Sequence, residues 1–576
     1  MAFKQVEVRR RGRDNTGNDS SRMIMAREIP NQANGAILYL TSDFSRTGLL
    51  VCLGAILVLL RLINSYVVRP WRHWFKARQL GCGSVPTEPR KWPLGLDIVR
   101  NGLMADKDQR MPEYVTDRFE AMGRYTWRMN VLGSSNFITA EPRNIQAILA
   151  TQFDEFKLGD VRTTNLKLFL GRSIFAVDGP AWHSAREVMR PLFTRENVSN
   201  VRLLEGRSQS MMRCLLESSE GVRSTSQDKD GRTWTAPVSL AALLPRFTLD
   251  SATEVFLGQS ANSLEARLRG EKKEDLNWAL EQMVPLLRMR LTLRGLYWIY
   301  GNKELRRIAA VMHQFTNDAM DKADATVRSG ENRAKYDFLD TLRARCADRD
   351  EVREQVLGLL AAGTDTTAAL TGWVFYSLIR NPRVFAKLRQ IVLQHFGEAT
   401  GGTDAADSVT FEKLKNCTYL QHVLNETLRR HSVVPLNSRC AKRDTTLPTG
   451  GGPDGTQPIF VPAGTECNFS THILHRRKDL WGPDADDFVP ERWEKRRPGT
   501  FHYVPFNGGP RICIGQQFAL TEAGFVVVRI LQEFDAIEGL DLDSTSRDYS
   551  NFGITCAPGS SIDRHEGVLC RLRLAK

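Results

Sequence analysis

Residues 506–515, with the sequence FNGGPRICIG, constrain this chain more than any other segment. They place one cysteine, Cys513, in a loop with glycines on both sides, directly before a stretch that predicts a helix from Gln516. Glycines let the backbone approach a flat ring closely and adopt φ values that other residues resist. Backbone N–H groups and the first turn of a helix stabilise a thiolate over a thiol. The segment therefore predicts a loop whose cysteine binds a metal; the alternative is a buried cysteine in an ordinary turn.

Cysteine spacing and charge distribution each exclude a class of protein. The ten cysteines follow no regular spacing, which predicts neither a disulfide framework nor a zinc site and favours a reducing compartment. The net charge of +13 would be compatible with a nucleic-acid partner. However, residues 1–90 hold 14 Lys or Arg against 6 Asp or Glu. Because most of the excess lies in this N-terminal region, we expect no nucleic-acid partner.

A long apolar stretch, residues 352–379, predicts a helix that ends before Pro382. Inside it stands the sequence AGTDTT, with Gly363, Asp365 and Thr366. These residue types lower helix propensity, by about 1 kcal/mol for glycine relative to alanine. Such a local conflict in a buried helix is typical of a functional site. The alternative is a groove of small residues for helix packing.

Two pairs of residues stand at helical spacing. Glu426 and Arg429 lie at positions i and i+3 in ETLR, and Trp182 and Arg186 lie at i and i+4 in WHSAR. Each pair therefore shares one face of a helix. Farther along, Arg492 lies in the segment FVPERW. Surface helices carry such pairs freely, so only their combination with the cysteine segment is informative.

Taken together, these segments resemble the motifs of the cytochrome P-450 family. The pattern F-x-x-G-x-R-x-C-x-G agrees with the haem-binding signature of that family at its five fixed positions: Phe506, Gly509, Arg511, Cys513 and Gly515. No break in composition divides the chain after about residue 90. The resemblance implies a mainly α fold with small β-sheets, the cytochrome P-450 fold, in one haem-thiolate monooxygenase domain over residues 91–576.

The resemblance also implies a cofactor and a role for each motif. Haem b would be bound with Cys513 as the axial thiolate ligand of its iron. Asp365 and Thr366 would be catalytic, because they would steer protons and water to the haem so that the O–O bond of dioxygen breaks heterolytically. The remaining motif positions would bind the haem, several of them through its propionates: Trp182, Arg186, Arg439, Phe506, Gly509, Arg511 and Gly515.

Glu426, Arg429 and Arg492 would, by the same resemblance, form a buried ionic triad behind the cysteine loop. Burying charges is costly, and removing one member leaves the others without a partner. The role of the triad would therefore be structural. We expect the loss of one member to release haem rather than to slow turnover.

The N-terminal region predicts a membrane anchor. Residues 1–47 are polar and predict a disordered tail. Residues 48–68 are mostly apolar and reach the length of about 20 residues that a bilayer core requires, with Arg61 extending to the interface. A buried core helix and a cleaved signal are the alternatives. Basic residues and prolines at 69–90 predict a hinge and, by the positive-inside rule, a cytoplasmic catalytic domain. The resemblance adds the endoplasmic reticulum as the location of this single-pass protein.

Electrons are expected from another protein. No Gly-x-Gly-x-x-Gly fingerprint for a flavin or nicotinamide opens a predicted helix, and no length is left for a fused reductase. The resemblance implies NADPH as the source, through a separate flavoprotein reductase. We expect this reductase to dock on the face of the cysteine loop, next to basic residues such as Arg186, Arg190 or Lys442.

Four short segments resemble one branch of the family more closely, the fungal alkane and fatty-acid ω-hydroxylases: residues 443–448, 450–455, 475–485 and 515–523. A long-chain alkane or fatty acid is therefore the first expectation for a hydrophobic substrate. A tailoring monooxygenase of a fungal secondary-metabolite pathway, acting on a polyketide or terpenoid, is the alternative. A haem isomerase or a peroxide-driven haem protein is a third class. The Asp365–Thr366 pair disfavours it, because such a protein does not need to protonate bound peroxide.

Two smaller expectations concern charged residues and loops. Lys157, Arg162 and Arg172 are candidates to meet a substrate carboxylate, although surface cations usually meet only water. The glycine-rich residues 397–404 and 450–455 predict surface loops.

Overall fold

The chain divides into two compact units, Met1–Arg72 and His73–Lys576. The computed structural model describes residues 46–194, 200–217, 225–271, 275–328, 336–398, 408–540, 548, 550–553, 555–560 and 567–575. The second unit contains the candidate site and all strands of the described residues. The predicted polar tail lies, up to residue 45, outside the described residues.

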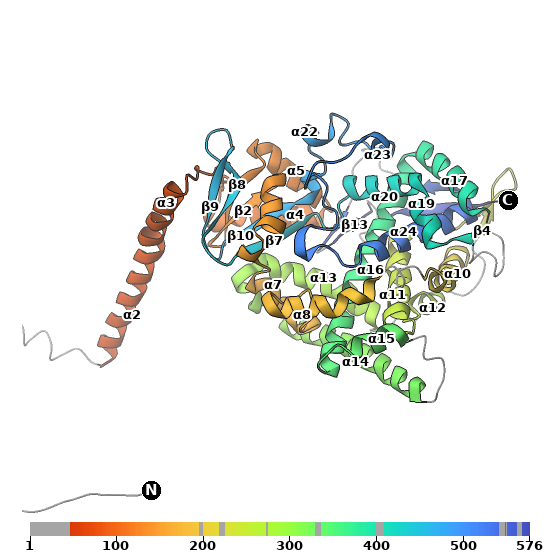
Figure 1. Cartoon of the computed structure of the whole chain (residues 1–576), viewed down its shortest axis with the longest axis horizontal. Coiled ribbons are helices and arrows are strands. Elements are labelled where there is room, and N and C mark those ends of the chain that lie inside the picture. The colour runs from red at the N-terminus through yellow and green to blue at the C-terminus, as the bar shows by residue number, and fades with distance from the viewer. Residues whose placement is uncertain are drawn as a thin grey trace, which may run out of the picture. The chain divides into compact units, whose positions relative to one another are not determined.

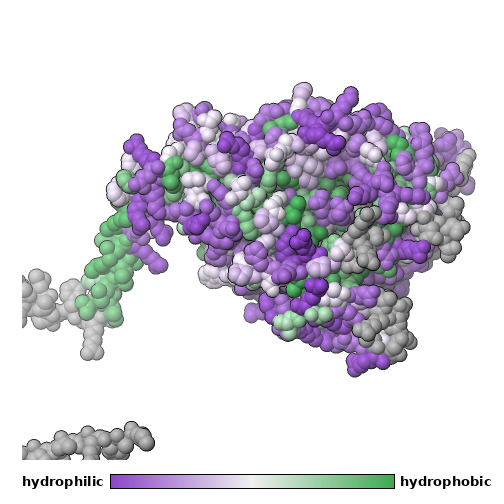
Figure 2. Space-filling model, in the orientation of Figure 1, coloured by the Kyte–Doolittle hydropathy of each residue, from purple (hydrophilic) through white to green (hydrophobic). Residues whose placement is uncertain are grey.

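The described part of the first unit is an apolar helix. Helix α2 (Arg46–Ile63) continues through a π-helical turn, η1 (Asn64–Val68), into α3 (Arg69–Gln79). Among the described residues, Gly48–Gln79 alone is long and apolar enough to cross a membrane, with a mean hydropathy of 2.1 in its most apolar window. None of that window is buried, and Figure 2 shows α2 as hydrophobic along its length. The predicted span, residues 48–68, therefore lies within continuous helix.

The second unit is mainly helical, as predicted. Its helices are α4 (Leu96–Lys107), α5 (Met111–Met122), α6 (Pro142–Gln146), α7 (Asp160–Leu170), α8 (Gly179–Met189), α10 (Arg202–Leu216), α11 (Leu240–Leu257), α12 (Ser263–Leu268), α13 (Leu276–Leu293), α14 (Asn302–Arg328), α15 (Asp337–Arg343), α16 (Arg349–Arg380), α17 (Pro382–Phe396), α19 (Phe411–Asn416), α20 (Thr418–Arg430), α21 (Thr471–Leu474), α22 (Lys478–Trp481), α23 (Arg492–Lys495) and α24 (Gln516–Glu533).

Helix α16 forms the centre of this unit. It contains the predicted helix 352–379 and ends just before Pro382, whose ring cannot continue the hydrogen-bonded ladder. Figure 1 shows α11 and α24 beside α16, and side chains from these three helices and from α20 share the largest hydrophobic core. Residues from Thr367 to Ile379 are all buried, so this half of α16 is enclosed by protein on every face.

Small sheets account for the strands. The larger sheet has the order β1-β2-β10-β7-β3, with β10 parallel to β2 and antiparallel to β7. A second sheet has the order β11-β14-β5-β4 with β6 beside β14, and two hairpins pair β8 with β9 and β12 with β13. The strands are β1 (Thr126–Val131), β2 (Ser134–Thr139), β3 (Phe156–Lys157), β4 (Thr225–Gln227), β5 (Thr233–Thr235), β6 (Val238–Ser239), β7 (Leu436–Ala441), β8 (Thr445–Gly451), β9 (Gln457–Val461), β10 (Glu466–Ser470), β11 (Phe534–Gly539), β12 (Ser550–Phe552), β13 (Cys556–Pro558) and β14 (Leu569–Leu574).

The segment expected to be a hinge is partly helical and partly bound to the larger sheet. Residues 69–79 form α3. Beyond it, the Pro86 carbonyl accepts from the Arg128 N–H at 2.8 Å, and the Glu88 N–H donates to the Arg128 carbonyl at 2.8 Å. Glu88 also pairs with Arg118 at 2.5 Å. The folded domain therefore begins before residue 91, because backbone groups that a hinge would leave in water pair with strand β1.

One of the two predicted glycine-rich loops is in part a strand. Gly450 and Gly451 are buried at the end of β8, where a Cβ on Gly450 would lie 2.6 Å from a methyl group of Thr126. Only the following residues, 452–455, make the turn into β9, closed by a bond from the Gly450 N–H to the Gly455 carbonyl at 2.8 Å. Close packing, rather than a need for flexibility, explains these two glycines. The other patch falls largely on residues 399–407, outside the described residues.

Candidate active site

The cysteine segment forms a tight loop that requires its glycine. A 3₁₀ turn (Gly509–Arg511) precedes Cys513, whose N–H donates to the Phe506 carbonyl at 2.9 Å. Gly509 has a φ of +67°, and a Cβ at this position would lie 1.9 Å from the Leu149 carbonyl oxygen. Any other residue would therefore push the loop away from its neighbour.

The Cys513 thiol lies close to the beginning of α24, with Gly515 as the residue that precedes the helix. Protein atoms surround the thiol, although its surface is accessible. Burial raises the pKa of the thiol, and the Gly515 N–H and the charge of Arg186 oppose this rise. Coordination to a metal ion deprotonates a thiol outright. The loop thus offers a ligand sulfur with two groups that favour its anionic form.

Two arginines share one hydrogen-bond acceptor. Arg439 on β7 and Arg162 on α7 donate from Nη1 to Asn437 Oδ1, at 3.1 and 3.0 Å. Arg439 is only 5% exposed, and burial followed by the charges of Arg162 and Arg511 lowers the pKa of Arg439 to about 9. Neither Arg439 nor Arg162 forms a salt bridge with a carboxylate of the described residues. An anionic ligand would stabilise two guanidinium groups held in this way.

Arg511 and Trp182 extend this basic cluster toward the cysteine. Arg511 Nη2 lies 2.6 Å from Asp178 Oδ1, and its guanidinium lies 4.5 Å from the centre of the Trp182 ring. Burial lowers the pKa of Arg511 to about 10, although Asp178 opposes this. The guanidinium of Arg186 lies 5.7 Å from the centre of the same ring and donates to the Ile512 carbonyl at 3.2 Å. The structure therefore brings Trp182, Arg186 and Arg511 together beside the sulfur.

Helix α16 carries the predicted catalytic residues without a break in its helical structure. Thr366 Oγ1 donates to the Ala362 carbonyl at 2.6 Å. A Cβ placed on Gly363 would meet no atom within 4 Å, so this glycine faces open space. Between described residues, no hydrogen bond or ion pair joins Asp365 or Thr366 to Cys513. The two groups of residues lie on separate elements, with room beside α16 for a ligand.

Asp365 holds its proton more tightly than an ordinary aspartic acid. Burial raises the pKa of Asp365 to about 7, and the charge of Glu281 on α13 adds to the rise. Glu281 itself accepts from Asn277 Nδ2 at 2.8 Å. An acid whose pKa lies close to the working pH both releases and takes up protons readily, which suits proton transfer.

Glu426, Arg429 and Arg492 are in contact, as expected for the triad. Arg429 Nη2 lies 2.8 Å and Arg492 Nε lies 3.4 Å from Glu426 Oε1, and the three side chains are 0 to 5% exposed. Trp493 Nε1 donates to Glu426 Oε2 at 3.0 Å. Arg429 also donates to the backbone carbonyls of His475, Ala485 and Asp487. Every buried charge in this cluster therefore has a partner, which is the condition for tolerating buried ions.

Motif comparison alone did not assign Arg162 or Glu281 to this site. Arg162 was a candidate for a substrate carboxylate, yet it lies against Asn437 with Arg439. Glu281 is an exposed residue of α13, and its charge acts on Asp365. Neither α7 nor α13 carries a distinctive residue pattern, so only the tertiary packing reveals these two positions.

The residues present fit a haem. A cysteine sulfur offers the axial ligand, and an arginine cluster with one paired carboxylate, Asp178, suits two propionates. Gly363 leaves the open space beside α16 that a ligand needs, and Gly509 lets the cysteine loop pack closely against the Leu149 carbonyl. When bound, a haem ligated by a thiolate supplies oxygen activation, because the sulfur pushes electron density toward the iron and favours O–O cleavage.

Comparison with protein families agrees with this geometry. The family model described as Cytochrome P450 matches residues 89–554, which is most of the chain. The protein therefore belongs to the cytochrome P450 family and is a monooxygenase of that family. The prediction made from the motifs is confirmed at this level.

Individual relatives share the greater part of the chain. The cytochrome P450 monooxygenase alt2 of Alternaria solani is 59% identical over 540 residues, which cover 92% of this chain and 99% of the relative. The cytochrome P450 monooxygenase g430 of a Fusarium species is 40% identical over 87% of both chains. Cytochrome P450 52A13 of Debaryomyces hansenii is 37% identical over 81% of this chain and 88% of its own.

Proposed function

We propose that this protein is a membrane-anchored monooxygenase that uses dioxygen, and electrons from NADPH through a separate flavoprotein reductase, to hydroxylate a hydrophobic substrate. The observation that carries the proposal is the Cys513 loop beside an arginine cluster with a single paired carboxylate. This arrangement suits a haem with two propionates and an axial thiolate. Family membership supports haem and a redox partner in general.

Each site residue has a defined part in this proposal. Cys513 binds the iron, and Asp365 and Thr366 transfer protons on the side of α16. The triad of Glu426, Arg429 and Arg492 holds the fold behind the loop. The haem is bound by the remaining predicted residues, together with Arg162: Trp182, Arg186, Arg439, Phe506, Gly509, Arg511 and Gly515.

The substrate proposal is a long, neutral aliphatic chain. Two of the three cations considered for a substrate carboxylate pair with protein carboxylates: Lys157 with Asp160 at 2.7 Å, and Arg172 with Asp348 and Glu354 at 2.7 and 2.8 Å. The third, Arg162, contacts Asn437 beside Arg439 and is assigned to the haem. A fatty-acid carboxylate therefore loses these candidate partners. Similarity to cytochrome P450 52A13 is consistent with the branch that the motifs resemble.

A tailoring monooxygenase that acts on a polyketide or terpenoid is the second candidate. The observation that favours it is that alt2 of Alternaria solani, which is 59% identical, has a name outside the numbered 52 series, whereas cytochrome P450 52A13 is 37% identical. Both candidates use the same oxygen chemistry. They differ in substrate shape, so the substrate test below separates them.

We further propose that the catalytic domain lies in the cytoplasm against the membrane of the endoplasmic reticulum. The apolar helix α2 and the basic residues Arg69, Arg72, Lys76 and Arg78 after it support this orientation. On the domain itself, the segment after α13 exposes large apolar side chains: Leu296, Trp298, Ile299 and Tyr300. Such a patch suits contact with lipid.

A chain-length series tests the proposal. The full chain, reconstituted with a flavoprotein reductase and NADPH, is incubated with alkanes, fatty acids, polyketides and terpenoids. Binding should strengthen with chain length, by about 0.8 kcal/mol per methylene that the protein buries. Product that requires NADPH and dioxygen supports the monooxygenase; conversion without NADPH would support a peroxide-driven protein or an isomerase. Turnover of polyketides or terpenoids alone would favour the second candidate.

A further inference from the structure

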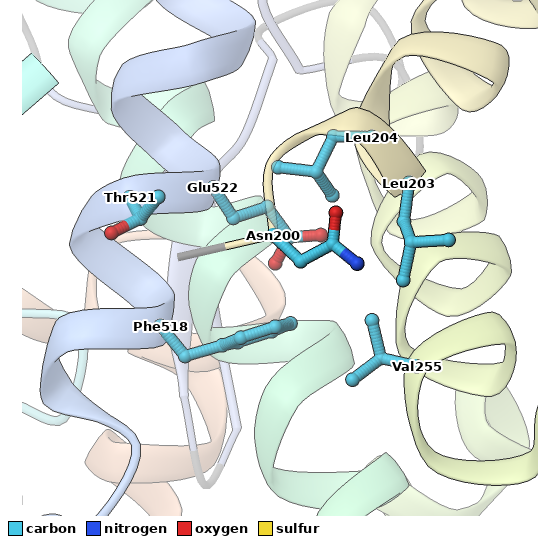
Figure 3. A pocket seen from close by; sticks show the side chains of 7 residues that line it. All are labelled: Asn200, Leu203, Leu204, Val255, Phe518, Thr521 and Glu522. Carbon is cyan, nitrogen blue, oxygen red and sulfur yellow. The ribbon is translucent and has the colours of Figure 1, made fainter. Parts of the chain in front are cut away.

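A small cavity lies between α10, α11 and α24, and none of the residues assigned above lines it. Its volume, measured as the space open to the centre of a water molecule, is about 20 Å³. About 10 to 15 Å³ on this measure holds one water. Figure 3 shows its lining residues: Asn200, Leu203, Leu204, Val255, Phe518, Thr521 and Glu522.

Glu522 is the polar group deepest in this cavity. The residue is 1% exposed, and its Oε1 accepts a hydrogen bond from the Ser251 hydroxyl. Its other oxygen, Oε2, is buried and has no hydrogen-bond partner among the described residues. Figure 3 shows the carboxyl group behind the carboxamide of Asn200, which is exposed at the edge of the cavity. A buried carboxyl oxygen needs a partner, and a single water between Glu522 and Asn200 meets that need.

Ser251 connects this carboxyl group to the site. Ser251 and Thr248 lie in the same turn of α11. Thr248 Oγ1 donates to the Thr364 carbonyl on α16 at 2.9 Å, directly before Asp365. One buried turn of α11 is therefore hydrogen-bonded to α16 on one side and to α24 on the other. Helix α24 is the element that follows the Cys513 loop.

We propose that Glu522 is a positioning residue. Its hydrogen bond with Ser251 fixes the position of α24 against α11, and one water in the cavity binds Glu522 Oε2. This packing of α24 against α11 determines the position of the Cys513 loop relative to α16. The inference rests on the proposed role of Cys513 as the axial ligand. Glu522 itself lies in the second turn of α24, which begins after the Cys513 loop, and no hydrogen bond or ion pair of the described residues joins it to Cys513 or to Gly363.

The charged groups around the cavity leave Glu522 in its acid form. Burial raises the pKa of Glu522 to about 8, and the bond from Ser251 opposes the rise. The charged residues of the neighbouring turns bind other groups than Glu522. Arg207 pairs with Glu254 at 3.0 Å, and Arg529 pairs with Glu205 at 2.9 Å. Asp250 accepts from the Ser263 and Leu264 N–H groups. A neutral acid donates one hydrogen bond, which the cavity water accepts.

Ionisation of Glu522 would disturb the packing of α24 against α11. Above about pH 8 the carboxylate has no proton to donate, and a buried negative charge without a cation is unfavourable. We therefore expect α24 to shift as the pH rises through this value, and the thiolate ligation at Cys513 to weaken with it.

The test is the spectrum of the reduced carbon monoxide complex of the full chain between about pH 6 and about pH 9. In the wild type, the fraction with the red-shifted Soret band of thiolate ligation should fall as the pH rises through about 8. Glu522→Gln keeps an acceptor for Ser251 but cannot ionise, so its fraction should stay high throughout. Glu522→Leu and Ser251→Ala should lower the fraction at every pH.

A control separates positioning from general loss of stability. Thr316 is fully buried on α14, and its hydroxyl bonds the Met312 carbonyl at 3.0 Å. Thr316→Val should lower the melting temperature without changing the pH profile of the spectrum. A crystal structure should show one water in the cavity, and an empty cavity would refute that part of the proposal.

Two results would overturn the inference. One is a Glu522→Gln profile that falls with pH as the wild type does; the other is a Glu522→Leu spectrum identical to that of the wild type. Absence of the thiolate band in the wild type at every pH would instead contradict the assignment of Cys513. If Glu522→Leu does not fold, the comparison between the wild type and Glu522→Gln still decides the question.

Discussion

Arg162 and Arg439 hold their guanidinium groups against a single acceptor, Asn437 Oδ1, at 3.0 and 3.1 Å. One comes from a helix and the other from a strand, and no carboxylate of the described residues pairs with either. Like charges so close together are unfavourable unless an anion lies between or beside them. We interpret Arg162 as a second propionate partner, added to the residues that motif comparison identified.

Removal of Arg162 should weaken haem retention. A charge-assisted hydrogen bond contributes about 1.5 to 3 kcal/mol, so Arg162→Met should speed haem loss roughly tenfold or more. Haem transfer to an excess of apomyoglobin measures this rate. Arg172→Met is the matched control, because Arg172 pairs with Asp348 and Glu354 on the surface. Normal haem retention with weaker substrate binding would return Arg162 to the role of a substrate residue.

Cys513→Ala should abolish the red-shifted Soret band of the reduced carbon monoxide complex. The reason is that the thiolate push on the iron comes from this sulfur alone. Cys346→Ala, which removes another cysteine with a partly exposed side chain, should leave the band unchanged. A Cys513→Ala protein with full haem content and the thiolate band would show that another residue is the ligand.

Proton transfer at α16 should depend on pH through Asp365. Its raised pKa of about 7 means that the folded protein keeps a proton that the unfolded chain releases at about pH 4. Below both pKa values, protonated Asp365 makes its full contribution to the free energy of unfolding. This contribution is lost as the pH rises through about 7. Asp365→Asn should therefore flatten the dependence of the melting temperature on pH in this window.

The same group should govern how electrons are used. The share of NADPH electrons recovered in product should fall as the pH rises through about 7, because the proton donor is then ionised. Glu281→Gln removes a charge that raises the pKa of Asp365, so the fall should move to lower pH. Thr366→Ala should divert electrons to hydrogen peroxide. Unchanged coupling in Asp365→Asn and Thr366→Ala would contradict the proton-transfer role.

Loss of Glu426 should destabilise the whole haem domain. Glu426→Ala leaves Arg429 and Arg492 without their shared carboxylate in a buried site, which costs about 3 to 5 kcal/mol. The purified variant should be largely free of haem or aggregated. Glu113→Ala is a fitting control, because Arg110 and Glu113 form an exposed pair with the same i,i+3 spacing at 2.6 Å, and such pairs contribute about 0 to 1 kcal/mol.

Reductase docking should respond to charge reversal near the cysteine loop. Arg190 and Lys442 are exposed, whereas Arg186 donates a hydrogen bond to the Ile512 carbonyl. Arg190→Glu and Lys442→Glu should raise the KM for reductase and weaken its dependence on salt, since salt screens the attraction between exposed charges farther apart than the Debye length of about 10 Å. Turnover driven by peroxide should not change. Identical salt curves for the wild type and both variants would place the docking surface elsewhere.

Local patterns determined much of this protein without any coordinates. The glycine and arginine positions around Cys513, the helix from 352 to 379 with its end at Pro382, and the pairing of Glu426 with Arg429 each depend on residues close in the chain. Backbone conformation and helical spacing are set by such neighbours, so one sequence suffices to predict them. The apolar span at 48–68 is predictable for the same reason, because length and hydropathy are local quantities.

Only the tertiary structure decided which distant residues complete each site. Arg162 and Arg439 meet at Asn437, the charge of Glu281 raises the pKa of Asp365, and Ser251 donates to Glu522, although nothing in the short segments around them indicates a partner. Packing of α7, α13 and α11 against the rest of the domain creates these contacts. An arginine or a glutamate has the same local signature whether water or a buried group faces it. Its chemistry is therefore set by burial and by neighbours that the chain folding brings to it.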